Sequence, residues 1–390
     1  MAFDASGHRL ADVVRDPSVT PAHTASSARK LYLDWLRGVG VLVMIQGHVI
    51  DSWTLAEDRR RDAYHLISFV GGVGGAPLFL FLAGVALTLG AVARFRRGRT
   101  ETEAAALARR RGWQIFGLAF LFRLQSWIIS GGPPSSLLKV DILNIIGLSM
   151  VAAALILSAR RRWRAVLFTF AAFAFAMFTP LVRALEPLAA LPDPLERYLR
   201  PVGTGTAFTM FPWAGFLLAG CAVGLWLDTK TPREERWVNY TVALVGAALV
   251  GAGYAASFLP AIYAQTDFWT SSPTFFFIRL GFVLMLVGAA YLWHTDRRGQ
   301  SRVPMFFTGA PLAELGRSSL FVYWIHVEMA YGVLTAPLHR RLPLEQAYVG
   351  FLLFALMLYG LVKAKNRILG FNGAQVLGFR FRGSRQNATI

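Results

Sequence analysis

The chain has 390 residues, of which 55% are hydrophobic and only 16% are charged, and its formal net charge is +18. This composition is typical of a membrane protein and argues against a large soluble core. Its single cysteine, Cys221, excludes a disulfide framework and a cysteine metal site. Residues 1–30 lack an apolar segment followed by a small-residue cleavage site, so we interpret them as a mobile cytoplasmic tail and not a signal peptide.

Ten apolar stretches follow this tail, each close to the roughly 20 residues that a membrane-spanning helix needs. The sequence therefore predicts an all-α fold, a polytopic transmembrane bundle of about ten helices within residues 31–363. Residues 364–390 are expected to form a basic cytoplasmic tail. The expected spans are 31–52, 66–92, 112–130, 141–158, 164–182, 207–227, 238–258, 274–293, 318–336 and 346–363.

Lysine and arginine are distributed unevenly between the two sets of connecting loops. Of the 40 such residues, 28 lie in the two tails and in alternate loops, whereas nine lie in the opposite loops. By the positive-inside rule, both termini and the arginine-rich loops are predicted to be cytoplasmic. We interpret the basic runs as topology signals that also contact anionic headgroups of the lipid bilayer. We do not expect nucleic acid to be a partner.

The first apolar stretch, residues 31–52, carries four ionisable residues. A charge inside a spanning helix costs roughly 2.5–3.5 kcal/mol on insertion scales, so such residues are expected to be functional. The eleven residues from Arg37 to His48 return to nearly the same helix face and rise about 16 Å. These two side chains therefore mark two depths on one polar face. Asp34 lies near Arg37 on the cytoplasmic side, and Asp51 lies near His48 on the other side.

Five motifs of the chain are similar to those of one membrane acyltransferase family. They are Arg-x10-His opened by LDWLRG, APLFLFLAG (76–84), VDILNIIGLS (140–149), FPWAGFLLAG (211–220) and LGRSSLFVYWIHVEMAYG (315–332). With them the chain resembles the heparan-α-glucosaminide N-acetyltransferases. The resemblance implies an enzyme that takes an acyl group, usually acetyl, from cytoplasmic acetyl-CoA or another acyl-CoA. It also implies transfer to an acceptor, often a sugar, on the far side of the membrane.

The chemistry of acyl transfer assigns roles to the first helix. The reaction needs a base that takes the acceptor's proton or a nucleophile that holds the acyl group, and His48 suits either role. Asp51, three residues on, is expected to orient its imidazole. The resemblance also implies a working histidine in the loop after this helix, where His65 is the candidate. Both histidines therefore stay open as the base.

The same helix carries the residues expected to bind the donor. Arg37 is predicted to hold a phosphate of CoA, because a guanidinium suits that geometry. Asp34 and Arg37 are three residues apart, which also suits a structural ion pair.

Other polar residues inside the apolar stretches complete the predicted site. His326 lies about mid-span and is expected to take part in catalysis, with Tyr323 on the same helix face. Packing between helices is the alternative role for His326, and a buried ion pair is the alternative for Arg123 and Asp141. The predicted substrate-binding residues are Arg123, Asp141, Asn144, Arg279 and Tyr323.

Three functions are compatible with these residues. The first is the acyltransferase, the second is a secondary transporter that relays protons through buried His, Asp and Arg, and the third is a non-catalytic scaffold. No HExxH motif or paired-cysteine spacing occurs, so no metal is expected. The acceptor stays open among sugars, glycans and lipid-linked groups, as do N- or O-acylation, the acyl chain length and a homodimer. The absence of a cleavable signal and of a large lumenal domain favours a bacterial inner membrane.

Overall fold

The computed structural model describes residues 30–203, 206, 208–229, 231–295 and 310–369. The predicted tail over 1–30, apart from Lys30, lies outside the described residues, as does residue 370 onward of the predicted 364–390 tail. The α-helices are α1 (Leu31–Trp53), α2 (Asp62–Gly74), α3 (Ala76–Arg96), α4 (Glu101–Ser130), α5 (Ile142–Leu157), α6 (Arg164–Ala184), α7 (Asp193–Glu196), α8 (Met210–Trp226), α9 (Pro232–Ala256), α10 (Pro273–Thr295), α11 (Ala310–Arg317), α12 (Ser319–Tyr331) and α13 (Leu344–Ile368). Short 3₁₀ turns are η1 (Asp58–Arg60), η2 (Pro134–Leu138), η3 (Arg161–Trp163), η4 (Glu186–Ala190) and η7 (Val333–Leu338).

The apolar helices identify an all-α integral membrane protein. Among the described residues, 7 helices are long and apolar enough to cross a membrane, and α8 is apolar but shorter. Each of the ten predicted stretches coincides with helix over most of its length. The count of ten spans is nevertheless not confirmed, because α4 begins with a charged segment and α8 and α12 are short. The last helix, α13, also continues past the predicted boundary at residue 363.

One predicted span is divided by a helix break. The stretch 66–92 forms α2 and α3, which meet at Gly75, where the backbone leaves the helical region at φ −83° and ψ −103°. Proline at the start of α3 suits a new helix, because its missing N–H needs no partner there. Gly71 in this segment faces α1, since a Cβ placed on it would lie 3.8 Å from the Cα of Gly47, an ordinary van der Waals contact.

Capping boxes mark the beginning of three helices. Thr100, Asp141 and Thr231 each accept a hydrogen bond from the backbone N–H three residues later. The residue in that third position returns a hydrogen bond to the capping backbone, so two otherwise unpaired N–H groups are satisfied. These local signals set where α4, α5 and α9 begin.

Small residues bring the central helices into close contact. Helix α3 packs along α8, α4 along α5, and α9 along α10. At the first of these contacts, a Cβ on Gly84 would collide with the Leu217 carbonyl, and a Cβ on Gly220 would collide with the Phe81 carbonyl. Close backbone approach through small residues is a main source of helix association within lipid.

Replacing Gly220 by leucine is therefore expected to destabilise the fold by at least about 1–3 kcal/mol, the usual range for overpacking. The added side chain cannot be placed without separating α3 from α8. The measurement is thermal unfolding of the purified protein in nanodiscs. Gly117→Leu on α4 is the matched control, because an added Cβ there meets nothing within 4 Å. An equal Tm for the two variants would contradict this account.

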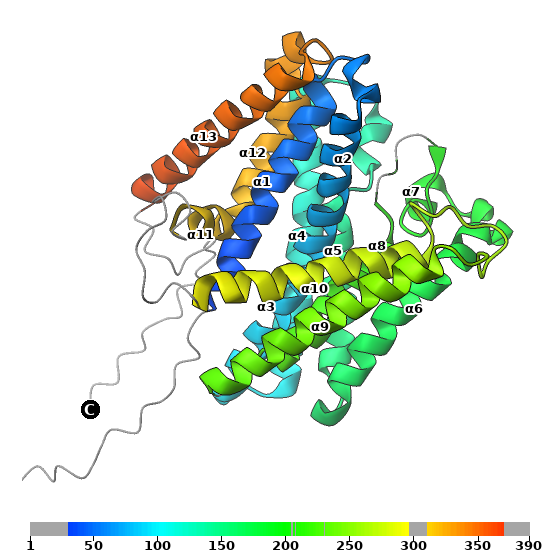
Figure 1. The fold of residues 1–390 in the computed structure, drawn as a ribbon, viewed down its shortest axis with the longest axis vertical. Helices are drawn as coiled ribbons and strands as arrows, with labels where there is room; N and C mark the ends of the chain where they lie inside the picture. The colour runs from blue at the N-terminus through cyan, green and yellow to red at the C-terminus, as the bar shows by residue number, and fades with distance from the viewer. Residues whose placement is uncertain (1–29, 204–205, 207, 230, 296–309, 370–390) are drawn as a thin grey trace, which may run out of the picture. The chain divides into compact units, whose positions relative to one another are not determined.

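Helix α1 packs against the late helices of the chain. It runs beside α11, α12 and α13, with α2 also in contact (Figure 1). The α1–α11 contact is again set by glycine, since a Cβ on Gly38 would collide with the Leu312 carbonyl. At the other end of α1, Trp53 Nε1 donates to the Ala330 carbonyl over 3.2 Å. These contacts hold α11 beside the first part of α1 and α12 beside its last part.

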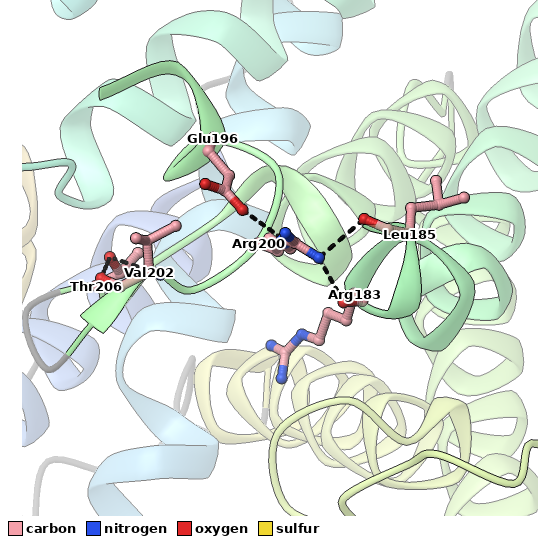
Figure 2. A network of polar contacts seen from close by, with 6 residues as sticks. All are labelled: Arg183, Leu185, Glu196, Arg200, Val202 and Thr206. Atoms are coloured by element: carbon pink, nitrogen blue, oxygen red, sulfur yellow. Dashed lines mark hydrogen bonds and ion pairs between the residues drawn. The ribbon is translucent and has the colours of Figure 1, made fainter. Parts of the chain in front are cut away.

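The connection between α6 and α8 is fixed by one arginine (Figure 2). Arg200 Nε donates to Glu196 Oε1 over 2.6 Å, and Nη1 donates to the Leu185 carbonyl over 2.9 Å. The same connection supplies Tyr198, whose hydroxyl accepts a hydrogen bond from Asn144 Nδ2 at 3.3 Å. The connection is thus held over the first turn of α5.

Candidate active site

Two histidines from distant parts of the chain meet between α1 and α12. Nδ1 of His48 lies 2.9 Å from Nε2 of His326. The two ring planes differ by 3° and their centroids are 5.0 Å apart, which suits a hydrogen bond in the plane of both rings. His326 is 0% exposed, and His48 is partly buried. The two histidines that the sequence placed on separate helices therefore form one hydrogen-bonded pair.

The hydrogen-bond network determines where the protons of this pair lie. The Val322 carbonyl can only accept, so Nδ1 of His326 carries a proton and donates to it over 2.8 Å. In the neutral ring, Nε2 of His326 is then an acceptor, and Nδ1 of His48 must donate to it. The unprotonated nitrogen of neutral His48 is consequently Nε2. His48 presents a base, and both N–H groups of the pair are already engaged.

The group predicted to orient His48 contacts other residues instead. The Asp51 carboxylate accepts a hydrogen bond from the Tyr331 hydroxyl at 2.9 Å and lies 3.6 Å from Nη1 of Arg59. The Tyr331 ring stands edge-on to His48, with centroids 5.5 Å apart. Spacing of i and i+3 made Asp51 a neighbour of His48, but Nδ1 of His48 donates its hydrogen bond to Nε2 of His326. His326, and not Asp51, therefore makes the hydrogen bond with Nδ1 of His48, and a catalytic role of Asp51 stays a prediction.

His65 lies apart from the histidine pair. It is exposed on α2, and its ring is 6.1 Å from that of Tyr64. Tyr64 in turn lies under the guanidinium of Arg59, at 5.7 Å. His65 therefore contacts its neighbour on α2 and makes no hydrogen bond or ring contact with His48 or His326 among the described residues.

A cavity of about 590 Å³ lies between α1, α3, α4, α5 and α12. Its walls are largely apolar, with arginines from three helices and no acidic residue among its described lining. It reaches Met44, one turn before His48, and Tyr323, three residues before His326. The lining residues are Arg37, Met44, Phe79, Ala83, Ala86, Leu87, Gly90, Arg94, Leu107, Ala108, Arg110, Arg111, Gln114, Ile115, Ile142, Leu143, Ile146, Met150, Ser319, Leu320 and Tyr323.

Arginines line this cavity at two depths. Arg37 lies 3.9 Å from the Asp34 carboxylate and donates to the Leu82 carbonyl over 3.4 Å. Arg94 follows Leu82 on α3 by twelve residues, a rise of about 18 Å away from the histidines. Arg111, on α4, also lines the cavity. Neither Arg94 nor Arg111 has a hydrogen bond or ion pair with any residue that the structure describes.

Sequence reasoning expected cytoplasmic basic residues near Arg37 to help hold acyl-CoA, but it placed Arg94, Arg110 and Arg111 in loops and did not single them out as site residues. The expected spans ended at residue 92 and began at residue 112, whereas α3 and α4 extend beyond both limits. The residue spacing in the sequence could have indicated Arg111. Arg111 lies on one helix face with Leu107 and Gln114, at intervals of four and three residues.

The remaining predicted substrate-binding residues separate into two places. Arg123 Nη2 lies 3.2 Å from Asp141 Oδ2, so this ion pair is formed as predicted. Asp141 also caps α5 together with Asn144. Arg279 lies elsewhere, over the ring of Phe275 at 4.0 Å. These contacts give each residue a structural role, and their role toward a substrate stays a prediction.

The catalytic-domain model of heparan-alpha-glucosaminide N-acetyltransferase matches residues 29–259, more than half of the chain. The match contains α1 and the cavity walls from α3, α4 and α5, whereas His326 and Tyr323 on α12 lie beyond it. A comparison with functionally curated proteins finds no match. The matched span indicates a function of the acetyltransferase type for this membrane protein. The chain therefore belongs to the heparan-alpha-glucosaminide N-acetyltransferase catalytic family, with an activity of the acetyltransferase type.

Proposed function

We propose that this protein transfers an acyl group, usually acetyl, from cytoplasmic acyl-CoA to a sugar or glycan acceptor on the other side of the membrane. One observation carries the proposal. The cavity is lined by Arg94, at the end away from the histidines, and by Arg111, neither of which has a hydrogen bond or ion pair with the described residues, and it reaches within one helical turn of the His48–His326 pair. A long ligand with phosphates at one end and a reactive group at the other fits such a cavity.

The donor would lie along this cavity with its phosphates at the arginine end. Arg94, Arg110 and Arg111 supply the charge for the phosphates, because guanidinium groups bind phosphate bidentately. Arg37 lies further in, where its pairing with Asp34 holds the guanidinium at the wall. The apolar stretch beyond it would hold the pantetheine arm. The thioester would then lie beside Met44, near both histidines.

His48 would act as the general base. The acceptor's N–H or O–H gives its proton to Nε2 of His48 as its heteroatom attacks the thioester carbon. His326 keeps Nε2 unprotonated by accepting from Nδ1 of His48, which is a positioning role. When the C–S bond breaks, the proton passes from His48 to the departing CoA sulfur. The acceptor's proton therefore ends on the CoA thiol, and His48 is neutral again.

The acceptor would approach from the end of α1 that carries Asp51. The Asp51 side chain is 53% exposed, and Tyr331 stands between it and His48. Both are polar and within reach of a sugar bound there. The uneven distribution of arginine supports an extracytoplasmic position for this end, with both termini in the cytoplasm. Location in a bacterial inner membrane and a homodimer belong to this proposal as predictions.

The proposal is tested by incubating the purified protein in nanodiscs with labelled acetyl-CoA and a panel of amino sugars, neutral sugars and lipid-linked sugars. Transfer of label to one acceptor class is the expected result. A secondary transporter would instead leave acetyl-CoA unbound and move a solute into proteoliposomes in response to a proton gradient. Absence of both CoA binding and acyl transfer would overturn the enzyme assignment.

Replacing His326 by leucine is expected to lower kcat by about 10–100-fold, because the His48 N–H loses its acceptor and the tautomer is no longer fixed. The KM for acyl-CoA should stay close to that of the wild type. His326→Gln, whose amide oxygen can accept the same hydrogen bond, should retain more activity. The combination with His48→Gln should be no slower than His48→Gln alone, since both act through one group. Additive losses would contradict a positioning role.

A further inference from the structure

The histidine pair supplies a base but has no donor left for the oxyanion. Acyl transfer places negative charge on the thioester oxygen, and a preorganised donor at that position is a large part of catalysis. Nδ1–H of His48 is used by His326, and Nδ1–H of His326 is used by the Val322 carbonyl. The donor must therefore come from another residue on the cavity wall.

Tyr323 is the polar lining residue nearest to the pair along α12. It lies three residues before His326, about one helical turn, and its ring centroid is 5.8 Å from that of the imidazole. Phe122 packs against the other part of the ring, with centroids 5.8 Å apart. These ring contacts fix the phenol against the cavity near His326.

The hydroxyl of Tyr323 makes no hydrogen bond with any residue that the structure describes. Three other tyrosine hydroxyls are hydrogen-bonded: Tyr331 to Asp51, Tyr198 to Asn144 and Tyr359 to Glu314. A half-buried hydroxyl without a partner is unfavourable, and an acceptor on a bound ligand removes that cost. The phenol hydroxyl can thus donate a hydrogen bond to a ligand oxygen in the cavity.

We infer that Tyr323 is the oxyanion donor of the transfer reaction, an inference that rests on the proposed acyl-CoA-dependent function. As the acceptor heteroatom bonds to the thioester carbon, the C=O electron pair moves onto oxygen. The resulting oxyanion accepts the hydrogen bond of the Tyr323 hydroxyl, which keeps its proton. The C=O bond then re-forms, the C–S bond breaks, and the thiolate takes the proton that His48 removed from the acceptor.

The test is Tyr323→Phe, which removes only the hydroxyl and keeps the ring contacts with Phe122 and His326. A drop in kcat of about 10²-fold is expected, as for loss of one oxyanion-hole donor. The KM for acetyl-CoA and the thermal shift that CoA produces should change less than about twofold, because an oxyanion donor acts on the transition state. Tyr359→Phe makes the same chemical change outside the cavity and should leave kcat unchanged.

A trifluoromethyl-ketone analogue of acetyl-CoA gives a second measurement, since its tetrahedral adduct mimics the oxyanion. Its binding should weaken in Tyr323→Phe in proportion to kcat. If that variant does not fold, 3-fluorotyrosine at position 323 keeps a more acidic hydroxyl and should raise kcat with donor binding unchanged. A wild type without transfer activity would defeat the proposed function. A wild type that transfers, with Tyr323→Phe equally fast or altered only in KM, would overturn this inference alone.

Discussion

Replacing His48 by glutamine is expected to lower kcat for acyl transfer by about 10²–10⁴-fold, the usual range for loss of a general base. Glutamine is close to histidine in size, and its amide N–H can still donate to Nε2 of His326. The variant therefore keeps the contact between α1 and α12 and loses only the basic nitrogen. Binding of acetyl-CoA, measured by the thermal shift that CoA produces, should remain that of the wild type.

The control for this variant is His65→Gln. His65 is exposed on α2, and its ring contact is with Tyr64. Its replacement should change kcat by less than about twofold, as for a surface substitution away from the site. The two variants together decide which histidine is the base. A slow His65→Gln beside a fast His48→Gln would reverse the assignment and place the chemistry at the start of α2.

Helical periodicity predicted the polar face of α1 but not what packs against it. The spacing from Arg37 to His48 predicted that the two side chains lie at different depths. Arg37 and Met44 are the α1 residues that line the cavity, and Arg37 is the one farther from His48. The partner of His48 lies 278 residues away in sequence. Which helix lies beside α1 depends on close backbone approach, here through Gly38 and the Leu312 carbonyl. The helical periodicity of a single sequence does not predict which helix packs beside α1.

The errors in the predicted site have local physical causes. Asp51 was paired with His48 from an i, i+3 spacing, but η1 brings Arg59 back toward the end of α1 and attracts the carboxylate. The break at Gly75 was missed because the run from residue 66 to 92 is apolar throughout, and hydropathy does not distinguish one long helix from two. Arg94 and Arg111 were assigned to loops because a hydropathy window ends where charges begin, although the helices continue.

Replacing Arg94 and Arg111 together by glutamate is expected to raise the Kd for CoA by at least about 100-fold. Each charge-assisted hydrogen bond to phosphate contributes about 1.5–3 kcal/mol, and about 1.4 kcal/mol corresponds to a factor of ten in affinity. Two introduced carboxylates would also repel the phosphates. The measurement is a CoA titration in nanodiscs, repeated at rising salt. Wild-type affinity should fall with ionic strength, because part of it comes from charges near water.

The matched control is the double variant of Arg97 and Arg109 to glutamate. These arginines lie at the same ends of α3 and α4 and are exposed, but they do not line the cavity. The control changes net charge and the positive-inside signal by the same amount, so any shared effect on insertion cancels. Its CoA affinity should stay within about threefold of the wild type, since both side chains are exposed and their charges are screened by salt. Equal losses in both double variants would mean that general surface charge attracts CoA, and the cavity would then lose its assignment as the donor site.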